Sequence, residues 1–145
     1  MQRRIPYPPI SKKHAKEVLN LKKIINNLLK YINRQNRMEE DSNNVNIEQL
    51  KQMMKQNAVL VDVRSPQEYK EKHIKGAILI PSYEIQKKAD KILNEKQAPI
   101  IVYCLSGARS KKAIKTLKKL GYINLYHLQG GIDAYPNAND LYIIN

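Results

Sequence analysis

The sequence predicts an α/β protein, with a small parallel sheet flanked by helices on both faces and a basic amphipathic helix near the N-terminus. Short runs of apolar, β-branched residues alternate with lysine-rich helical segments after about residue 46. This alternation is typical of a parallel sheet whose strands are buried on both faces. All five glycines fall at joints of the alternation, and most of the positive charge lies in the first 37 residues.

Length and composition fit one domain of ordinary size with an extension. The chain has 145 residues, of which 42% are hydrophobic and 27% charged, so part of it can bury a core. A tandem multidomain enzyme is excluded. No run approaches the roughly 18 apolar residues that span a bilayer, and no apolar segment follows the basic residues at the start. We therefore expect a soluble, cytoplasmic protein.

The N-terminal segment is strongly basic. Residues 1–37 hold ten Lys and Arg residues and one acid, Glu17, in a chain with 26 basic and 13 acidic residues and a net charge of +13. Apolar residues recur there at alternating steps of three and four, as on one face of a helix: Val18, Leu21, Ile25, Leu28 and Ile32. This spacing predicts an amphipathic helix over about 11–37, since Pro6, Pro8 and Pro9 keep earlier residues out of it.

Several roles are open to such a helix. It can pair with another helix or dock on its own domain, remain a mobile appendage, or bind an anionic membrane or nucleic acid. Pairing or docking is the favoured interpretation and peripheral membrane contact a less favoured one. No base-stacking pattern accompanies the charge, so no specific nucleic-acid partner is expected. The sequence does not indicate an oligomeric state.

The composition changes again after the basic segment. Residues 37–46 pass from basic to acidic and then to Asn and Ser, which predicts a linker. We therefore expect a basic extension with its helix and linker over residues 1–41, and a folded domain over residues 42–145.

The elements of this domain follow from periodicity and punctuation. Helical patterns cover 47–56, 66–73, 82–95 and 108–120, and the second opens with Pro66, which suits the first helical position. Buried strands are predicted at 58–63, 77–80, 99–103 and 124–128.

The single cysteine, Cys104, directly follows the predicted strand 99–103 and precedes a glycine-containing loop that enters a helix. Ligands bind at this edge of open α/β sheets, and the N–H groups of such a loop favour a thiolate. A lone cysteine excludes an intramolecular disulfide and a multi-cysteine zinc site. We therefore expect a reactive thiol rather than an inert buried one, with no metal and no cofactor.

Six segments in order resemble the rhodanese-like single-domain sulfurtransferases over about residues 44–135: VNIEQL, LVDVRSPQEY, HIKGAILIP, IIVYCLSGARS, KKLGY and HLQGGIDAY. The resemblance implies a small parallel-sheet domain whose Cys104 forms a persulfide. It would take a sulfane sulfur from thiosulfate or a persulfide donor and pass it to cyanide, a thiol or an acceptor protein.

The resemblance also assigns roles to neighbouring residues. The active-site and substrate-binding loop would comprise Leu105, Ser106, Gly107, Ala108, Arg109 and Ser110. Its N–H groups would hold the negative charge of the outer sulfur, and Gly107 would allow the tight curvature. Arg109 either binds an anionic donor or braces the loop, and Ser110 organises or caps it. Asp62 and Arg64, with Glu68, would support neighbouring loops, while His73 and His127 are expected to be structural.

Two other functions remain open. Cysteine-dependent phosphatases and arsenate reductases cradle an oxyanion in a longer cysteine-to-arginine loop. Here four residues separate Cys104 from Arg109, so the cradle suits a single sulfur atom better than a phosphate. The alternative from another class is a non-catalytic regulatory or interaction module of the same fold. Such modules commonly lack the cysteine.

Overall fold

The computed structural model describes residues 9–145, and the chain divides into two units between Ser42 and Asn43. Unit 1 contains helix α1, Lys12–Ser42, which begins after Ser11. The Ser11 hydroxyl accepts a hydrogen bond from the N–H of His14 at 3.3 Å, as an N-cap does. Pro6 and Pro8, used to predict where the helix begins, lie outside the described residues.

Helix α1 does not end near residue 37 as predicted. It continues to Ser42, so residues 37–42, expected to form a linker, are its last turns. The apolar pattern fades there, but polar and acidic residues are compatible with a helix. Among residues 9–145, neither this helix nor any other combines the length and apolarity needed to cross a membrane.

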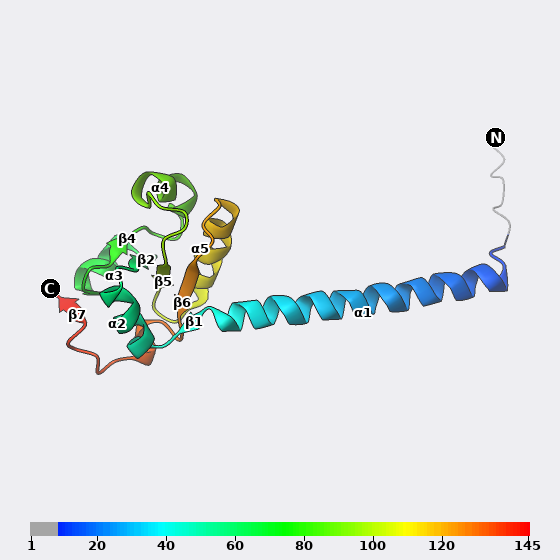
Figure 1. Ribbon diagram of the computed structural model, residues 1–145, viewed down its shortest axis with the longest axis horizontal. Coiled ribbons are helices and arrows are strands. Elements are labelled where there is room, and N and C mark those ends of the chain that lie inside the picture. The colour runs from blue at the N-terminus through cyan, green and yellow to red at the C-terminus, as the bar shows by residue number, and fades with distance from the viewer. Residues whose placement is uncertain (1–8) are drawn as a thin grey trace, which may run out of the picture. The chain divides into compact units, whose positions relative to one another are not determined.

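Unit 2 is built on a five-stranded parallel sheet with the strand order β1-β6-β5-β2-β4 (Figure 1). The strands are β1 (Asn44–Val45), β2 (Val59–Asp62), β4 (Ile78–Leu79), β5 (Ile100–Tyr103) and β6 (Leu125–Leu128). The predicted α/β class with a small parallel sheet is therefore confirmed. Strand β5 occupies the centre, and all four of its residues are buried.

Helices cover both faces of this sheet. Helices α4 (Ile85–Ile92) and α5 (Ala108–Lys119) pack on one face, and α2 (Ile47–Lys55) packs on the other. Alternate residues of β5 enter the two cores. Ile100 and Val102 join the core beneath α4 and α5, whereas Ile101 and Tyr103 join the core beneath α2. Burial on both faces explains why the strands read as continuous apolar runs.

The sequence patterns did not predict a second, antiparallel sheet. Strand β3 (Lys72–Ile74) pairs with β7 (Tyr142–Ile144) near the C-terminus. Helix α3 therefore ends at Glu71, two residues before the predicted end. The short strand β1 was also not predicted. Strands β1, β3 and β7 have only two or three residues each, and each pairs with a strand far along the chain.

Candidate active site

Cys104 lies at the carboxyl end of β5, the central strand of the sheet, as the sequence predicted. The chain then turns through Leu105 and Ser106 into α5. Gly107 makes this turn possible, because its φ of +108° is unfavourable for other residues. A Cβ atom on Gly107 would also lie 3.1 Å from two ring atoms of His127. Both conformation and space therefore favour glycine at this position.

The thiol is surrounded by hydrogen-bond donors. The N–H of Gly107 donates to Sγ at 3.0 Å, and the hydroxyl oxygen of Ser110 lies 3.5 Å from Sγ. Burial raises the pKa of Cys104. The Ser110 hydroxyl and the N–H groups of Ser110, Gly107 and Arg109 outweigh this effect and bring the pKa below its ordinary value. The residue is only 1% exposed, so this thiolate would be sheltered from water.

A buried chain of polar groups leads from the thiol to β6. The Ser110 hydroxyl donates to the carbonyl oxygen of Gly107 at 3.0 Å and lies 2.9 Å from Nδ1 of His127. Burial and, to a lesser extent, Lys111 lower the pKa of His127, which favours the neutral imidazole. A neutral imidazole with its proton on Nδ1 donates to the Ser110 oxygen and leaves the hydroxyl proton for Gly107 or for Sγ.

His127 was expected to be a core or edge residue, and it is buried in β6. Its contact with the active-site loop was not predicted. The contact arises because β6 lies parallel and next to β5, with His127 paired in register with Val102. A histidine near the carboxyl end of a neighbouring parallel strand is the sequence signal that could have indicated it.

Arg109 braces the loop. Its two terminal nitrogens donate to the two carboxylate oxygens of Glu68, each at 2.7 Å, in a bidentate pair. Glu68 also accepts the N–H of Ser65 at 2.9 Å in the capping box of helix α3, Pro66–Glu71. The Arg109 guanidinium, as the larger contribution, and the hydrogen bonds from Ser65 together lower the pKa of Glu68 to about 2. Of the two roles expected for Arg109, this contact corresponds to bracing.

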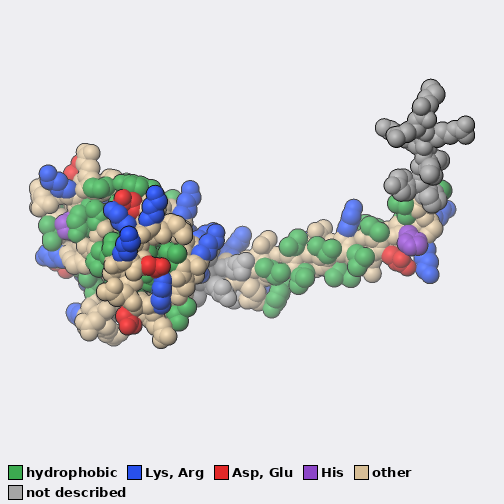
Figure 2. Space-filling view, turned by 90° about the horizontal axis from the view of Figure 1, so that it is seen from above, with side chains coloured by type: hydrophobic (Ala, Val, Ile, Leu, Met, Phe, Trp, Pro, Cys, Tyr) green, Lys and Arg blue, Asp and Glu red, His purple; other side chains and the backbone are tan. Residues whose placement is uncertain are grey.

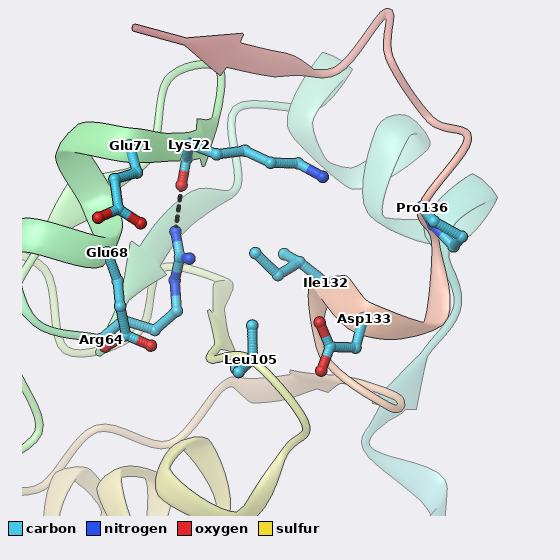
Figure 3. Close-up of a pocket in the computed structure, with 8 residues that line it drawn as sticks. All are labelled: Arg64, Glu68, Glu71, Lys72, Leu105, Ile132, Asp133 and Pro136. Carbon is cyan, nitrogen blue, oxygen red and sulfur yellow. Dashed lines mark hydrogen bonds between the residues drawn. The ribbon is translucent and has the colours of Figure 1, made fainter.

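Asp62 and Arg64 form a separate buried pair. The Arg64 guanidinium donates to Asp62 at 2.7 Å. It also donates to the carbonyl oxygen of Lys72 at 2.5 Å (Figure 3). The cluster expected from Asp62, Arg64 and Glu68 is thus two ion pairs, one at the end of β2 and one between α3 and the Cys104 loop. His73, also expected to be structural, contacts the carbonyl oxygen of Tyr69 at 2.7 Å through Nδ1.

A pocket of about 350 Å³ opens beside the Cys104 loop (Figure 3). Leu105 and Ile132 point into it, and carboxylates of Glu71 and Asp133 lie on its walls. The complete lining is Arg64, Glu68, Glu71, Lys72, Leu105, Ile132, Asp133 and Pro136. The pocket therefore combines an apolar centre with charged walls.

The chain after β6 holds the loop from the pocket side. The N–H groups of Ile132 and Asp133, in the 3₁₀-helix η1 (Ile132–Ala134), donate to the carbonyl oxygens of Cys104 and Leu105 at 3.1 and 3.0 Å. Gly131 permits this approach. A Cβ atom there would overlap the Leu105 carbonyl and lie 2.6 Å from the Cys104 oxygen.

Within residues 9–145, no three His, Cys, Asp or Glu side chains are grouped so that they could hold a metal ion. The chemistry available at the loop is that of a thiol with a lowered pKa, whose hydrogen bonds favour the nucleophilic thiolate and also suit an anion formed on it.

Comparison with known proteins identifies the class. The family model of the rhodanese-like domain matches residues 46–138, so the chain belongs to the rhodanese-like domain family.

The similarity to individual relatives covers only part of the chain. The chain is 38% identical over 78 residues to the uncharacterized protein YqhL of Bacillus subtilis, covering 54% of this chain and 60% of the relative. It is 40% identical over 76 residues to the probable adenylyltransferase/sulfurtransferase MoeZ of Mycobacterium tuberculosis. This match covers 52% of this chain and 19% of the relative. A structure of rhodanese with anions from E. coli aligns with a TM-score of 0.52 at 27% identity, covering 61% of this chain and 99% of that chain.

Proposed function

We propose that this protein is a sulfurtransferase that moves a sulfane sulfur through a persulfide on Cys104. The observation that carries the proposal is the convergence of the Gly107 N–H and the Ser110 hydroxyl on Sγ. These groups lower the pKa of Cys104 against the effect of burial and so provide a nucleophilic thiolate. The family and the similarity to part of a sulfurtransferase support the same chemistry.

The proposed reaction has two displacement steps. The Cys104 thiolate forms a bond to the outer sulfur of the donor, and the donor's sulfur–sulfur bond breaks. The electron pair of that bond leaves with the donor, as sulfite from thiosulfate or as a thiolate from a persulfide. An acceptor such as cyanide, a small thiol or a protein thiol then attacks the outer sulfur, and the Cys104 thiolate leaves. Atoms and electrons balance without an external oxidant or reductant.

The loop suits the intermediate. A persulfide anion carries its charge on the outer sulfur, one bond beyond Sγ. We expect the N–H groups of the loop between Leu105 and Ser110 to lie within reach of this position and to stabilise the charge as an oxyanion hole does. With four residues between Cys104 and Arg109, the loop is shorter than that of a cysteine-dependent phosphatase, and we expect it to suit one sulfur atom better than a phosphate.

The pocket beside the loop is the proposed site for the donor and the acceptor. Cys104 is 1% exposed, whereas Leu105 is 38% exposed and lines the pocket. We therefore expect the donor to reach the thiol by displacing Leu105. The pocket is lined by the carboxylates of Glu71 and Asp133 as well as by Lys72, so it is not a strongly cationic site for a dianion, and a persulfide donor is at least as compatible as thiosulfate.

Intact-mass analysis tests the proposal. Protein incubated with thiosulfate or a low-molecular-weight persulfide should gain one sulfur atom, about 32 Da, which cyanide or a thiol then removes. Cys104→Ser should gain nothing. No gain with either donor, in protein whose thiol still reacts with iodoacetamide, would refute the sulfur transfer and favour a non-catalytic interaction module.

A further inference from the structure

Helix α1 carries a continuous apolar face. Five side chains on this face are 42% to 57% exposed: Val18, Leu21, Ile25, Leu28 and Ile32. Figure 2 shows hydrophobic side chains following the helix along its length. A run of this size on a helix is typical of a surface that binds another molecule.

The spacing of these residues indicates the kind of partner. Steps of three, four, three and four residues give a period of 3.5, which corresponds to a heptad with Val18, Ile25 and Ile32 at position a and Leu21 and Leu28 at position d. β-branched residues at a with Leu at d favour two parallel strands. We propose that α1 pairs with α1 of a second copy of this chain as a short, parallel, two-stranded coiled coil.

The basic residues fit this pairing better than a membrane surface. The four f positions of the same register are all cationic: Lys16, Lys23, Lys30 and Arg37. Position f lies opposite the a/d face, so in a coiled coil these side chains remain in water. On a membrane, with the apolar face inserted, they would point away from the anionic headgroups that attract them.

Flanking positions complement each other between copies. In a parallel pair, position g of one helix faces position e of the next heptad of its partner. Glu17 at g then faces Lys22 at e of the second copy, an attractive pair. One heptad further, Ile24 at g faces Leu29 at e, and these side chains are 55% and 51% exposed. The in-register parallel alignment thus matches opposite charges and apolar side chains.

The size of the surface sets the strength of the pairing. The five a and d side chains, together with Ile24 and Leu29, expose roughly 600 Å² of apolar surface per helix. Two helices could therefore bury at most about 1,200 Å², which is the lower end of the range for specific interfaces. A surface at the lower end of this range favours a reversible dimer over a permanent one, and its formation should not depend on the sulfur chemistry of Cys104.

Sedimentation of the full chain at protein concentrations from about 1 to about 100 μM tests the pairing. The mass should rise from monomer to dimer across this range. Ile25→Lys/Leu28→Lys should abolish the rise, because it places charges in the seam. Asn20→Lys/Asn27→Lys, at the solvent-facing c positions, adds the same charge to the same helix and should still dimerise. A wild-type monomer throughout, or a dimer in the seam variant, would overturn the proposal.

Charge exchange tests the parallel register. Glu17→Lys and Lys22→Glu should each weaken the dimer, because like charges then face each other in both pairs. Mixed together, the two variants should form a heterodimer in which both pairs attract. Single variants that dimerise like the wild type would overturn the parallel register.

Binding to phosphatidylserine vesicles tests the alternative that α1 lies on a membrane surface. A wild-type chain that stays monomeric and binds these vesicles, with binding lost in Ile25→Lys/Leu28→Lys, would overturn the coiled coil in favour of a membrane surface.

Discussion

The Ser110 hydroxyl is the side chain that contributes most to a low thiol pKa at Cys104. It lies 3.5 Å from Sγ and 2.9 Å from Nδ1 of His127, while it also donates to the carbonyl oxygen of Gly107. Ser110→Ala removes this hydroxyl and adds no bulk at a fully buried position. We expect the pKa of Cys104 to rise in this variant.

The geometry also indicates the size of the rise. A hydrogen bond to a charged group contributes about 1.5–3 kcal/mol. The Ser110 hydroxyl is shared with the Gly107 carbonyl, so its contribution to the thiolate falls at the low end, about 1.5 kcal/mol, which corresponds to about a tenfold change in the acid dissociation constant of the thiol. The N–H of Gly107 still donates to Sγ in the variant, which limits the loss.

The rate of iodoacetamide alkylation, followed by intact mass against pH, gives this pKa directly. Cys104 is the only cysteine in the chain, so each adduct reports one thiol. The midpoint should move upward in Ser110→Ala, in keeping with an acid dissociation constant about tenfold smaller. Ser106→Ala is the matched control, because Ser106 lies on the same loop but is exposed. The midpoint is compared, rather than the absolute rate, because the burial of Cys104 slows alkylation in every variant.

An unchanged or lower midpoint in Ser110→Ala would refute this account of the thiolate. Circular dichroism separates this result from unfolding, since removal of the hydroxyl also leaves His127 and the Gly107 carbonyl without their partner. That loss should cost about 1–3 kcal/mol of stability. An equal shift in Ser106→Ala would also refute the reasoning, because the effect would then not depend on the bond to Sγ.

Two further substitutions test how the loop is held. Glu68→Gln should lower the free energy of unfolding by about 1–2 kcal/mol at pH 7, a figure reduced for the partial exposure of Arg109. The pKa of Glu68 is lowered to about 2 in the folded protein, so urea unfolding should show the full difference in stability between wild type and Glu68→Gln above about pH 4.5. This difference should disappear as the pH falls toward 2. A difference in stability that does not change with pH would contradict this reasoning. Gly131→Ala should cost more than about 2 kcal/mol, since its Cβ would overlap the Leu105 carbonyl. Gly121→Ala, where no atom lies within 4 Å of the added Cβ, should cost less in thermal unfolding, and equal losses would contradict the steric argument.

The sheet was predictable because its main strands are buried on both faces. In β5, Ile100 and Val102 face one core and Ile101 and Tyr103 the other, which makes the run apolar throughout. The predicted end of α1 near residue 37 was wrong, because the loss of the apolar pattern was interpreted as the end of the helix, which in fact continues to Ser42. Strands β3 and β7 were not predicted because Lys72–Ile74 becomes a strand only by pairing with Tyr142–Ile144, far along the chain.

Only the parts of the candidate site that are close together in the sequence could be predicted. Cys104, Gly107 and Ser110 lie within seven consecutive residues, so their common loop could be inferred from the order of strand, glycine and helix. The partners of the loop could not be inferred in this way. Glu68 lies 41 residues before Arg109, and His127 reaches Ser110 only through the register of β5 and β6. Such contacts are fixed by tertiary structure and leave no local pattern.

The Arg109–Glu68 pair favours sulfur transfer from a persulfide donor over chemistry on a tetrahedral dianion, whether phosphate or thiosulfate. A cysteine-dependent phosphatase needs the guanidinium of its loop directed at a tetrahedral dianion. Here both terminal nitrogens of Arg109 bind Glu68, so a dianion would have to displace a bidentate ion pair. A persulfide carries one negative charge, which we expect the backbone N–H groups of the loop to stabilise without a guanidinium. The short loop and the engaged arginine therefore favour the proposed sulfurtransferase for independent physical reasons, one of volume and one of charge.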